Sequence, residues 1–212
     1  SGSSDSARTR ALRLPPEIVE RAAQSLCWVS IVCAVTSVVT FMLQNYLQPE
    51  MAAMLAHPFQ RLTTLALVFL SLGFLVLMRG GWVSKEALLD LGTVFRVVVA
   101  FAIGVYETGL PITAEAPVRG LSGVAVWMVF TGFLLPNSPL KAGLAATGSV
   151  VAWPLAYWVN LQVHGFDPAP MNRLFVWMFP IVIMAVWSCV INARTIRMEM
   201  SKQKAEDLGS YQ

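Results

Sequence analysis

Charged side chains are scarce in this sequence. They make up 13% of the 212 residues and hydrophobic residues make up 56%, whereas ordinary soluble domains carry about 25% charged residues. The few charges are clustered, so long neutral runs separate them. Segments that alternate apolar and polar residues, which would indicate a membrane β-barrel, are missing as well. The composition therefore predicts an all-α, multi-pass integral membrane protein.

Cysteine and histidine are also rare, with three and two residues. Cys27, Cys33 and Cys189 fall within apolar segments, as small buried hydrophobes do. His57 and His164 are expected in loops, whereas a haem or chlorophyll ligand normally lies within a span and faces the bundle. No His or Cys pair has the spacing of a zinc site. We therefore predict no metal, haem, pigment or other cofactor bound by these side chains.

Signatures of catalysis are missing too. The sequence has no nucleophile triad, no phosphate-binding loop and no pair of carboxylates, and its loops are short. The net charge of +3 comes from Lys and Arg at the edges of apolar segments, so it does not indicate nucleic-acid binding. We expect no enzymatic activity within these residues. The expected partners are the lipid bilayer and either other membrane subunits or further copies of this chain.

Six apolar segments are candidates for membrane spans, since about 20 apolar residues cross the hydrocarbon core as one helix. They are residues 25–43, 62–78, 88–106, 120–135, 142–163 and 174–193. Pro154 and Pro180 lie inside the last two and predict kinks. The sequence therefore predicts a transmembrane bundle of six helices within residues 15–193.

Polar segments flank this predicted bundle on both sides. Residues 1–14 are small, polar and basic, which predicts a flexible cytoplasmic segment. Residues 194–212 carry the last span into a charged region that has no Pro or Gly before Gly209. A glycine just past the last turn is typical of a helix end. We therefore predict a cytoplasmic connector helix that continues the last span without a break to about Leu208.

Lys and Arg are distributed unevenly between the two sides of the predicted bundle. The side of the termini holds eleven, namely Arg8, Arg10, Arg13, Arg21, Arg79, Lys85, Lys141, Arg194, Arg197, Lys202 and Lys204. The opposite side holds three, namely Arg61, Arg119 and Arg173. Since cytoplasmic loops are enriched in Lys and Arg, both termini are predicted to be cytoplasmic.

Arg96 is the one charge well inside a predicted span. An ionisable residue there is by default a functional candidate. The alternative, which we prefer at this stage, is that its side chain snorkels to the membrane surface or binds helix-end carbonyls or a lipid phosphate. In either case we expect it to reach a polar partner. Glu107 is at the outer end of the same helix, about 16 Å away along the axis, so the two cannot pair within that helix.

Two further features concern packing. Small residues gather from Ala142 to Ser149, which allows close helix approach. We expect this segment to pack inside the bundle, with oligomerisation as the alternative. Tryptophans near the span ends and within spans fit aromatic belts and protein–lipid packing; they are Trp82, Trp127, Trp153, Trp158, Trp177 and Trp187.

The end of the connector resembles part of a known family. Leu208, Gly209, Ser210, Tyr211 and Gln212 are similar to the lead into the catalytic domain of bacterial eukaryotic-like Ser/Thr protein kinases, where a Leu-Gly-Ser-Tyr-type segment opens the first strand. Some members carry a multi-pass membrane region directly before the kinase. The resemblance implies an N-terminal region of this kind in a bacterial cytoplasmic (inner) membrane. No catalytic residue is carried over, because these residues include no glycine-rich loop, catalytic lysine or catalytic-loop aspartate.

Three functions are therefore under consideration. The first is the membrane anchor and sensor region of a Ser/Thr protein kinase, which predicts that the reading frame continues past Gln212 into a glycine-rich loop. The second is a structural accessory subunit of a larger membrane complex, for instance an energy-converting or photosynthetic one, which predicts co-purification with other membrane subunits. The third is a small transporter, which ranks lowest because interrupted helices with a polar lining are missing.

Overall fold

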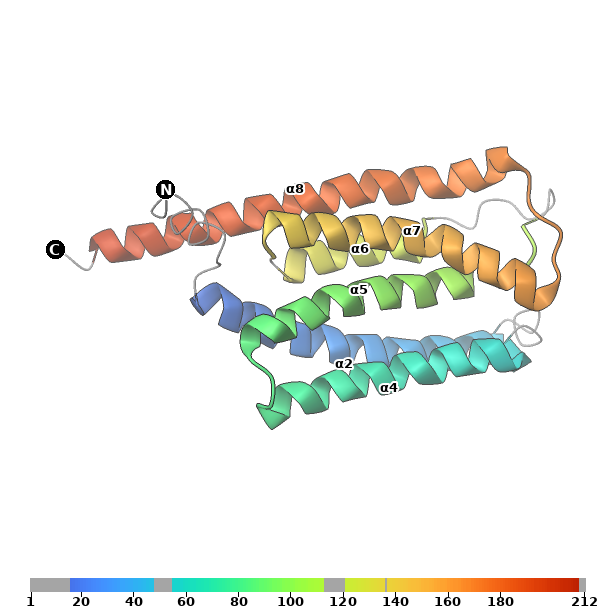
Figure 1. The fold of residues 1–212 in the computed structure, drawn as a ribbon, viewed down its shortest axis with the longest axis horizontal. Coiled ribbons are helices and arrows are strands. Elements are labelled where there is room, and N and C mark those ends of the chain that lie inside the picture. Colours follow the sequence, from blue (N-terminus) through green and yellow to red (C-terminus); the bar gives the residue numbers. More distant parts are fainter. Residues whose placement is uncertain (1–15, 48–54, 113–120, 136, 210–212) are drawn as a thin grey trace, which may run out of the picture.

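The computed structural model describes residues 16–47, 55–112, 121–135 and 137–209 (Figure 1). Its helices are α2 (Pro16–Leu47), α4 (Pro58–Gly80), α5 (Lys85–Glu107), α6 (Gly123–Leu134), α7 (Pro139–His164) and α8 (Met171–Gly209). The described residues contain no strand, so the predicted all-α class is confirmed. The predictions for residues 1–14 and for Ser210 to Gln212 lie outside the described residues.

Five helices are long and apolar enough to cross a membrane, and they are α2, α4, α5, α7 and α8. Helix α6 has only 12 residues, which is about 18 Å at 1.5 Å per residue. The hydrocarbon core is about 30 Å thick. Helix α6 is thus too short to span that core in a straight line. It is also shorter than the predicted span 120–135, because it begins after Ser122 and ends before Leu135. The length and composition of these helices indicate a membrane protein, with five candidate spans among the described residues.

The longest helix is α8, which has 39 residues and includes Pro180. It runs past Arg194 to Gly209 without interruption, as the sequence predicts. In Figure 1 its C-terminal part extends beyond the other helices, at the end of the bundle where α2 begins.

Helix α5 is central, because it packs against α7, α6, α2 and α4. Its approach to α7 depends on two glycines. A Cβ atom at Gly148 would lie 2.7 Å from Val97 Cγ2, and one at Gly104 would lie 3.0 Å from Ala156 Cβ. The small residues at the start of α7 thus serve packing inside the bundle, as expected, although Gly143 faces open space.

Polar contacts hold α8 to its neighbours. Ser188 Oγ donates to the Met128 carbonyl at 2.8 Å, and the backbone of α6 comes so close that a Cβ at Gly132 would lie 3.2 Å from Ser188 Cα. Asn192 makes a two-way contact with the segment between α6 and α7. Its Nδ2 donates to the Asn137 carbonyl and its Oδ1 accepts from the Asn137 N–H, both at 2.8 Å.

Ion pairs join different helices at the end of the bundle where α2 begins. They are Glu20–Lys85 at 3.0 Å, Arg21–Glu199 at 2.8 Å, and Asp90–Lys141. Exposed pairs of this kind contribute little stability, about 0–1 kcal/mol each. They do show which parts of the helices lie next to each other. The Arg21–Glu199 pair places α2 beside α8 beyond Arg194.

Candidate functional site

Arg96 lies in the middle of α5 and is only 2% exposed. Its side chain does not reach the surface, so the snorkelling interpretation that we preferred from the sequence is wrong. The Nε atom donates to Thr131 Oγ1 on α6 at 3.0 Å. The Arg96 carbonyl accepts from Trp127 Nε1 at 2.9 Å. The polar partner is therefore a neutral hydroxyl on the neighbouring helix.

The guanidinium of Arg96 is poorly satisfied for a buried group. Its Nη1 is buried and has no hydrogen-bond partner among the described residues. The Thr131 hydroxyl that accepts from Arg96 donates in turn to the Trp127 carbonyl at 2.8 Å. A guanidinium carries five N–H donors, and a buried charge without full compensation is destabilising. Arg96 is therefore a candidate for a functional rather than a stabilising role.

Glu107, the last residue of α5, has the opposite environment. Its Oε2 accepts from Ser122 Oγ at 2.8 Å and from Trp153 Nε1 at 2.9 Å, and its Oε1 accepts from the Gly123 N–H. The carboxylate thus lies at the first turn of α6, where the helix dipole favours negative charge. It joins the end of α5 and the start of α6 to the middle of α7. From the sequence we did not identify these partners of Glu107.

His57 lies outside the helices, as we expected from the sequence, whereas His164, which we also expected in a loop, belongs to a helix. His57 is the N-cap residue of α4, and its Nδ1 accepts from the Phe59 N–H at 3.3 Å. His164 is the last residue of α7. The centroids of the two imidazole rings are 4.4 Å apart. The two histidines therefore bring together the start of α4 and the end of α7.

Two buried amides lie close to the histidines in sequence, Gln60 on α4 and Asn160 on α7, and both are 0% exposed. Both donate to the Val105 carbonyl, at 3.4 Å and 2.8 Å. Asn160 also donates to Thr108 Oγ1 at 2.8 Å, and that hydroxyl donates to the Gly104 carbonyl. Since both partners of Asn160 accept, its amide orientation is fixed. The side-chain oxygens of both amides have no partner in the described part of the chain.

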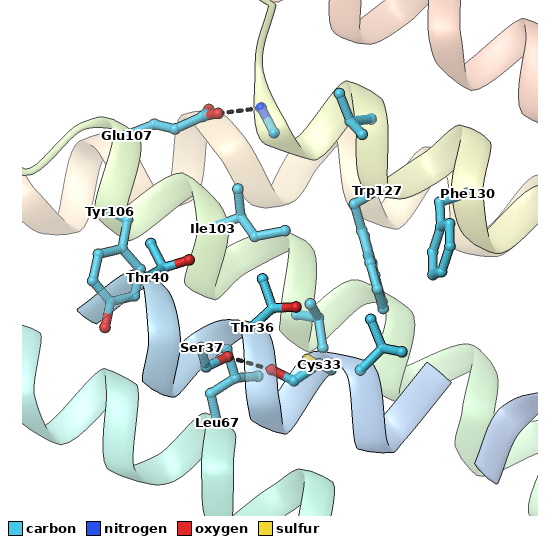
Figure 2. Close-up of a pocket in the computed structure, with 14 residues that line it drawn as sticks. Cys33, Thr36, Ser37, Thr40, Leu67, Ile103, Tyr106, Glu107, Trp127 and Phe130 are labelled. Carbon is cyan, nitrogen blue, oxygen red and sulfur yellow. Dashed lines mark hydrogen bonds between the residues drawn. The ribbon is translucent and has the colours of Figure 1, made fainter. Parts of the chain in front are cut away.

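A groove of about 480 Å³ lies between α2, α5 and α6 (Figure 2). Trp127, whose indole binds the Arg96 carbonyl, extends from α6 toward α2 and lines the groove. Glu107 lines it as well. Of the two charged residues, half-buried Glu107 therefore lines the groove, whereas Arg96 only contacts its wall through the bond from Trp127 to the Arg96 carbonyl.

No metal site is evident in the ranges that the structure describes, because they hold no group of three or more His, Cys, Asp or Glu side chains suited to an ion. Of the five residues that resemble the kinase junction, Leu208 and Gly209 form the last turn of α8. Searches against protein families, curated proteins and solved structures gave no match to this chain.

Proposed function

We propose that these residues form the membrane anchor and sensor region of a bacterial Ser/Thr protein kinase, with the catalytic domain located after the connector. Helix α8 is the observation that carries this proposal. Its 39 residues correspond to about 58 Å at 1.5 Å per residue, well beyond a hydrocarbon core about 30 Å thick. Its last two residues, Leu208 and Gly209, are the first two of the five that resemble the lead into such a kinase.

The contacts of α8 suit it to transmit motion. Asn192 fastens it to the segment between α6 and α7, and Glu199 pairs with Arg21 of α2. An isolated helix of this length is only marginally stable in water, and the Arg21–Glu199 pair is an exposed contact between α2 and the connector helix. A tilt or rotation of the membrane part of α8 would then reach the connector without being absorbed by a flexible joint.

The proposed topology has six crossings with both termini in the cytoplasm. The ion pair between Asp90 near the start of α5 and Lys141 near the start of α7 supports it. Since α5 and α7 begin at the same end of the bundle, the chain must return across the bundle between them. Helix α6 and its flanking residues make this return, and a bilayer can thin around a short span. The Lys and Arg excess then identifies the cytoplasmic side.

Cysteine labelling checks this topology. Single cysteines replace Asp167, between α7 and α8, and Lys85, at the start of α5, in a background where Cys27, Cys33 and Cys189 are alanine. A membrane-impermeant maleimide should label position 167 in intact cells and position 85 only after permeabilisation. Labelling of both positions from the same side would refute the topology.

The kinase assignment is tested by reading the gene beyond Gln212 and assaying the full-length product in nanodiscs. We expect the frame to continue into a glycine-rich loop and a catalytic lysine, and the protein to phosphorylate itself from radiolabelled ATP. Substitution of that lysine by methionine is the control and should abolish labelling. A frame that encodes no kinase would refute the proposal. Stable co-purification with other membrane proteins in that case would favour an accessory subunit.

A further inference from the structure

The contact between His57 and His164 is a direct link between two helices that are not packed along their lengths. Helix α4 packs against α2 and α5, and α7 packs against α5, α6 and α8. The two imidazole rings meet where α4 begins and α7 ends, with their centroids 4.4 Å apart. Figure 1 shows this end of the bundle opposite to the end where α2 begins. A change in the two rings therefore acts on how α4 and α7 are held together there.

These two histidines are the only ones in the chain. Histidine is the side chain whose ordinary titration falls between pH 5 and 8, whereas Asp, Glu, Lys and Arg ordinarily keep their charge in that range. Both rings are half-buried, so a charge on them is screened less by salt than a charge on the open surface. Acidification across this range therefore concentrates new side-chain charge at one contact.

The position of His57 suits a neutral ring. As the N-cap residue of α4, His57 accepts a hydrogen bond from the Phe59 N–H through Nδ1 at 3.3 Å. In the charged ring both nitrogens carry a proton, so Nδ1 no longer accepts. The positive charge would also lie at the N-terminus of α4, where the helix dipole opposes it. Charging His57 therefore weakens the start of α4 and also creates repulsion with a charged His164.

No carboxylate compensates these charges within the described ranges. Neither histidine forms an ion pair there, and the buried Nε2 of His164 has no hydrogen-bond partner there. The other charged and titratable groups at this end of the bundle are Arg61 on α4, Tyr106 and Glu107 on α5, Asp167 between α7 and α8, and Arg173 on α8. Glu107 accepts from Trp153, which lies about 16 Å from His164 along α7. Two charged rings would therefore repel each other without an offsetting ion pair.

We propose that His57 and His164 form a pH-sensitive contact, which holds α4 to α7 while the rings are neutral and separates when both are protonated. The contact is complete near pH 8 and is lost as the pH falls through the histidine range. In the proposed topology this end of the bundle faces away from the cytoplasm, so the contact responds to the pH outside. Only that placement rests on the proposed function, because the contact itself does not depend on a kinase domain.

Spin labels on α4 and α7 test this switch in the intact chain in nanodiscs. The labels are attached to Leu62→Cys and Gln162→Cys, both at exposed positions, in a background where Cys27, Cys33 and Cys189 are alanine. Electron paramagnetic resonance measures the distance between the labels at pH 8 and at pH 5, the limits of the histidine range. We expect the distance to increase on acidification and to return to its first value when the pH is restored.

Three variants identify the groups that titrate. His57→Asn keeps a good N-cap residue and His164→Gln keeps a polar side chain, but neither new side chain gains a charge. Each of these two substitutions should remove most of the distance increase. Glu107→Gln removes the carboxylate at the end of α5 and should leave the increase unchanged.

Three outcomes would overturn the proposal. An unchanged distance in the protein with both histidines would mean that the rings tolerate their charges in contact. An increase that persists undiminished in either histidine variant would mean that the pair does not cause it. An increase that is lost only in Glu107→Gln would assign the titration to that carboxylate. The first readout needs no histidine variant to fold, and none of them uses a kinase assay, so failure of this inference is distinguishable from failure of the proposed function.

Discussion

Buried Arg96 and half-buried Glu107, both on α5, are accommodated in opposite ways. Glu107 accepts hydrogen bonds from Ser122, Gly123 and Trp153. Arg96 donates from Nε to the hydroxyl of Thr131, while its Nη1 has no partner within the described ranges. The two residues are about 16 Å apart along one helix, so a single helix carries one well-satisfied charge and one poorly satisfied charge.

The difference separates structural from functional polar groups. A carboxylate that satisfies three donors stabilises the junction of α5, α6 and α7, and removing it would leave those donors unpaired. A buried guanidinium with few acceptors destabilises the packing around it. Sites that break the rules of folding in this way are where functional residues are expected. We infer that Glu107 holds together the end of the bundle where α5 ends, and that Arg96 serves the function.

The largest effect is expected from Glu107→Ala. Each buried donor left without a partner costs about 1–3 kcal/mol, and the three losses overlap, so unfolding should become easier by on the order of 3 kcal/mol. Unfolding in mixed micelles, followed by tryptophan fluorescence, measures this change. Glu107→Gln keeps one acceptor oxygen and should lose less. A change below about 0.5 kcal/mol in the free energy of unfolding for Glu107→Ala would contradict the structural role of Glu107.

A smaller effect is expected from Gly132→Ala, which tests the support of Arg96. The added Cβ would meet Ser188 on α8 and push α6 away, and the neighbouring residue Thr131 is the acceptor for Arg96. Overpacking of this kind costs about 1–3 kcal/mol. Gly143→Ala is the matched control, because nothing lies within 4 Å of its Cβ position. The control should gain up to about 1 kcal/mol from helix propensity, and equal results for both variants would contradict the α6–α8 packing.

The smallest effect on stability is expected from Arg96→Met. Replacing a buried charge by an apolar side chain of similar length is often neutral or stabilising, so the free energy of unfolding should stay the same or rise by about 1 kcal/mol. The same unfolding assay measures it. In the full-length protein, the autophosphorylation rate of the proposed kinase domain should change although the stability of the membrane region does not. A loss of stability as large as that of Glu107→Ala would show that Arg96 is structural.

The sequence predicts the parts of the fold that depend on local pattern. The helical class is indicated by the neutral apolar runs. The continuity of α8 is indicated by the lack of Pro and Gly between Asn192 and Leu208. The start of α6 was missed, because hydropathy does not show where a helix begins within an apolar run. The Ser122 side chain, which accepts from the Val124 N–H, is a cap signal that would have marked it.

The contacts of the site depend on residues far apart in the chain, which periodicity does not pair. His57 and His164 meet although 107 positions separate them. A partial signal was present, because His57 and Gln60, like Asn160 and His164, are spaced to share one helix face. The prediction of aromatic belts and lipid packing was wrong for Trp127 and Trp153, which are 8% and 1% exposed. The indole N–H of Trp153 donates to half-buried Glu107 at the end of α5.

Helix α8 is proposed to couple the membrane bundle to the kinase domain beyond the connector. Insertions after Met200 in the full-length protein test this coupling, with autophosphorylation rates compared in nanodiscs of two acyl-chain lengths. Two glycines make a flexible joint. Seven alanines keep the helix and restore its facing to within about 20°. Membrane insertion should be the same for both.

We predict that the glycine pair removes the dependence of the autophosphorylation rate on bilayer thickness, while the seven alanines retain it. A rate that depends on thickness equally in the unmodified protein and in both variants would contradict the coupling role of α8 and leave only a membrane tether.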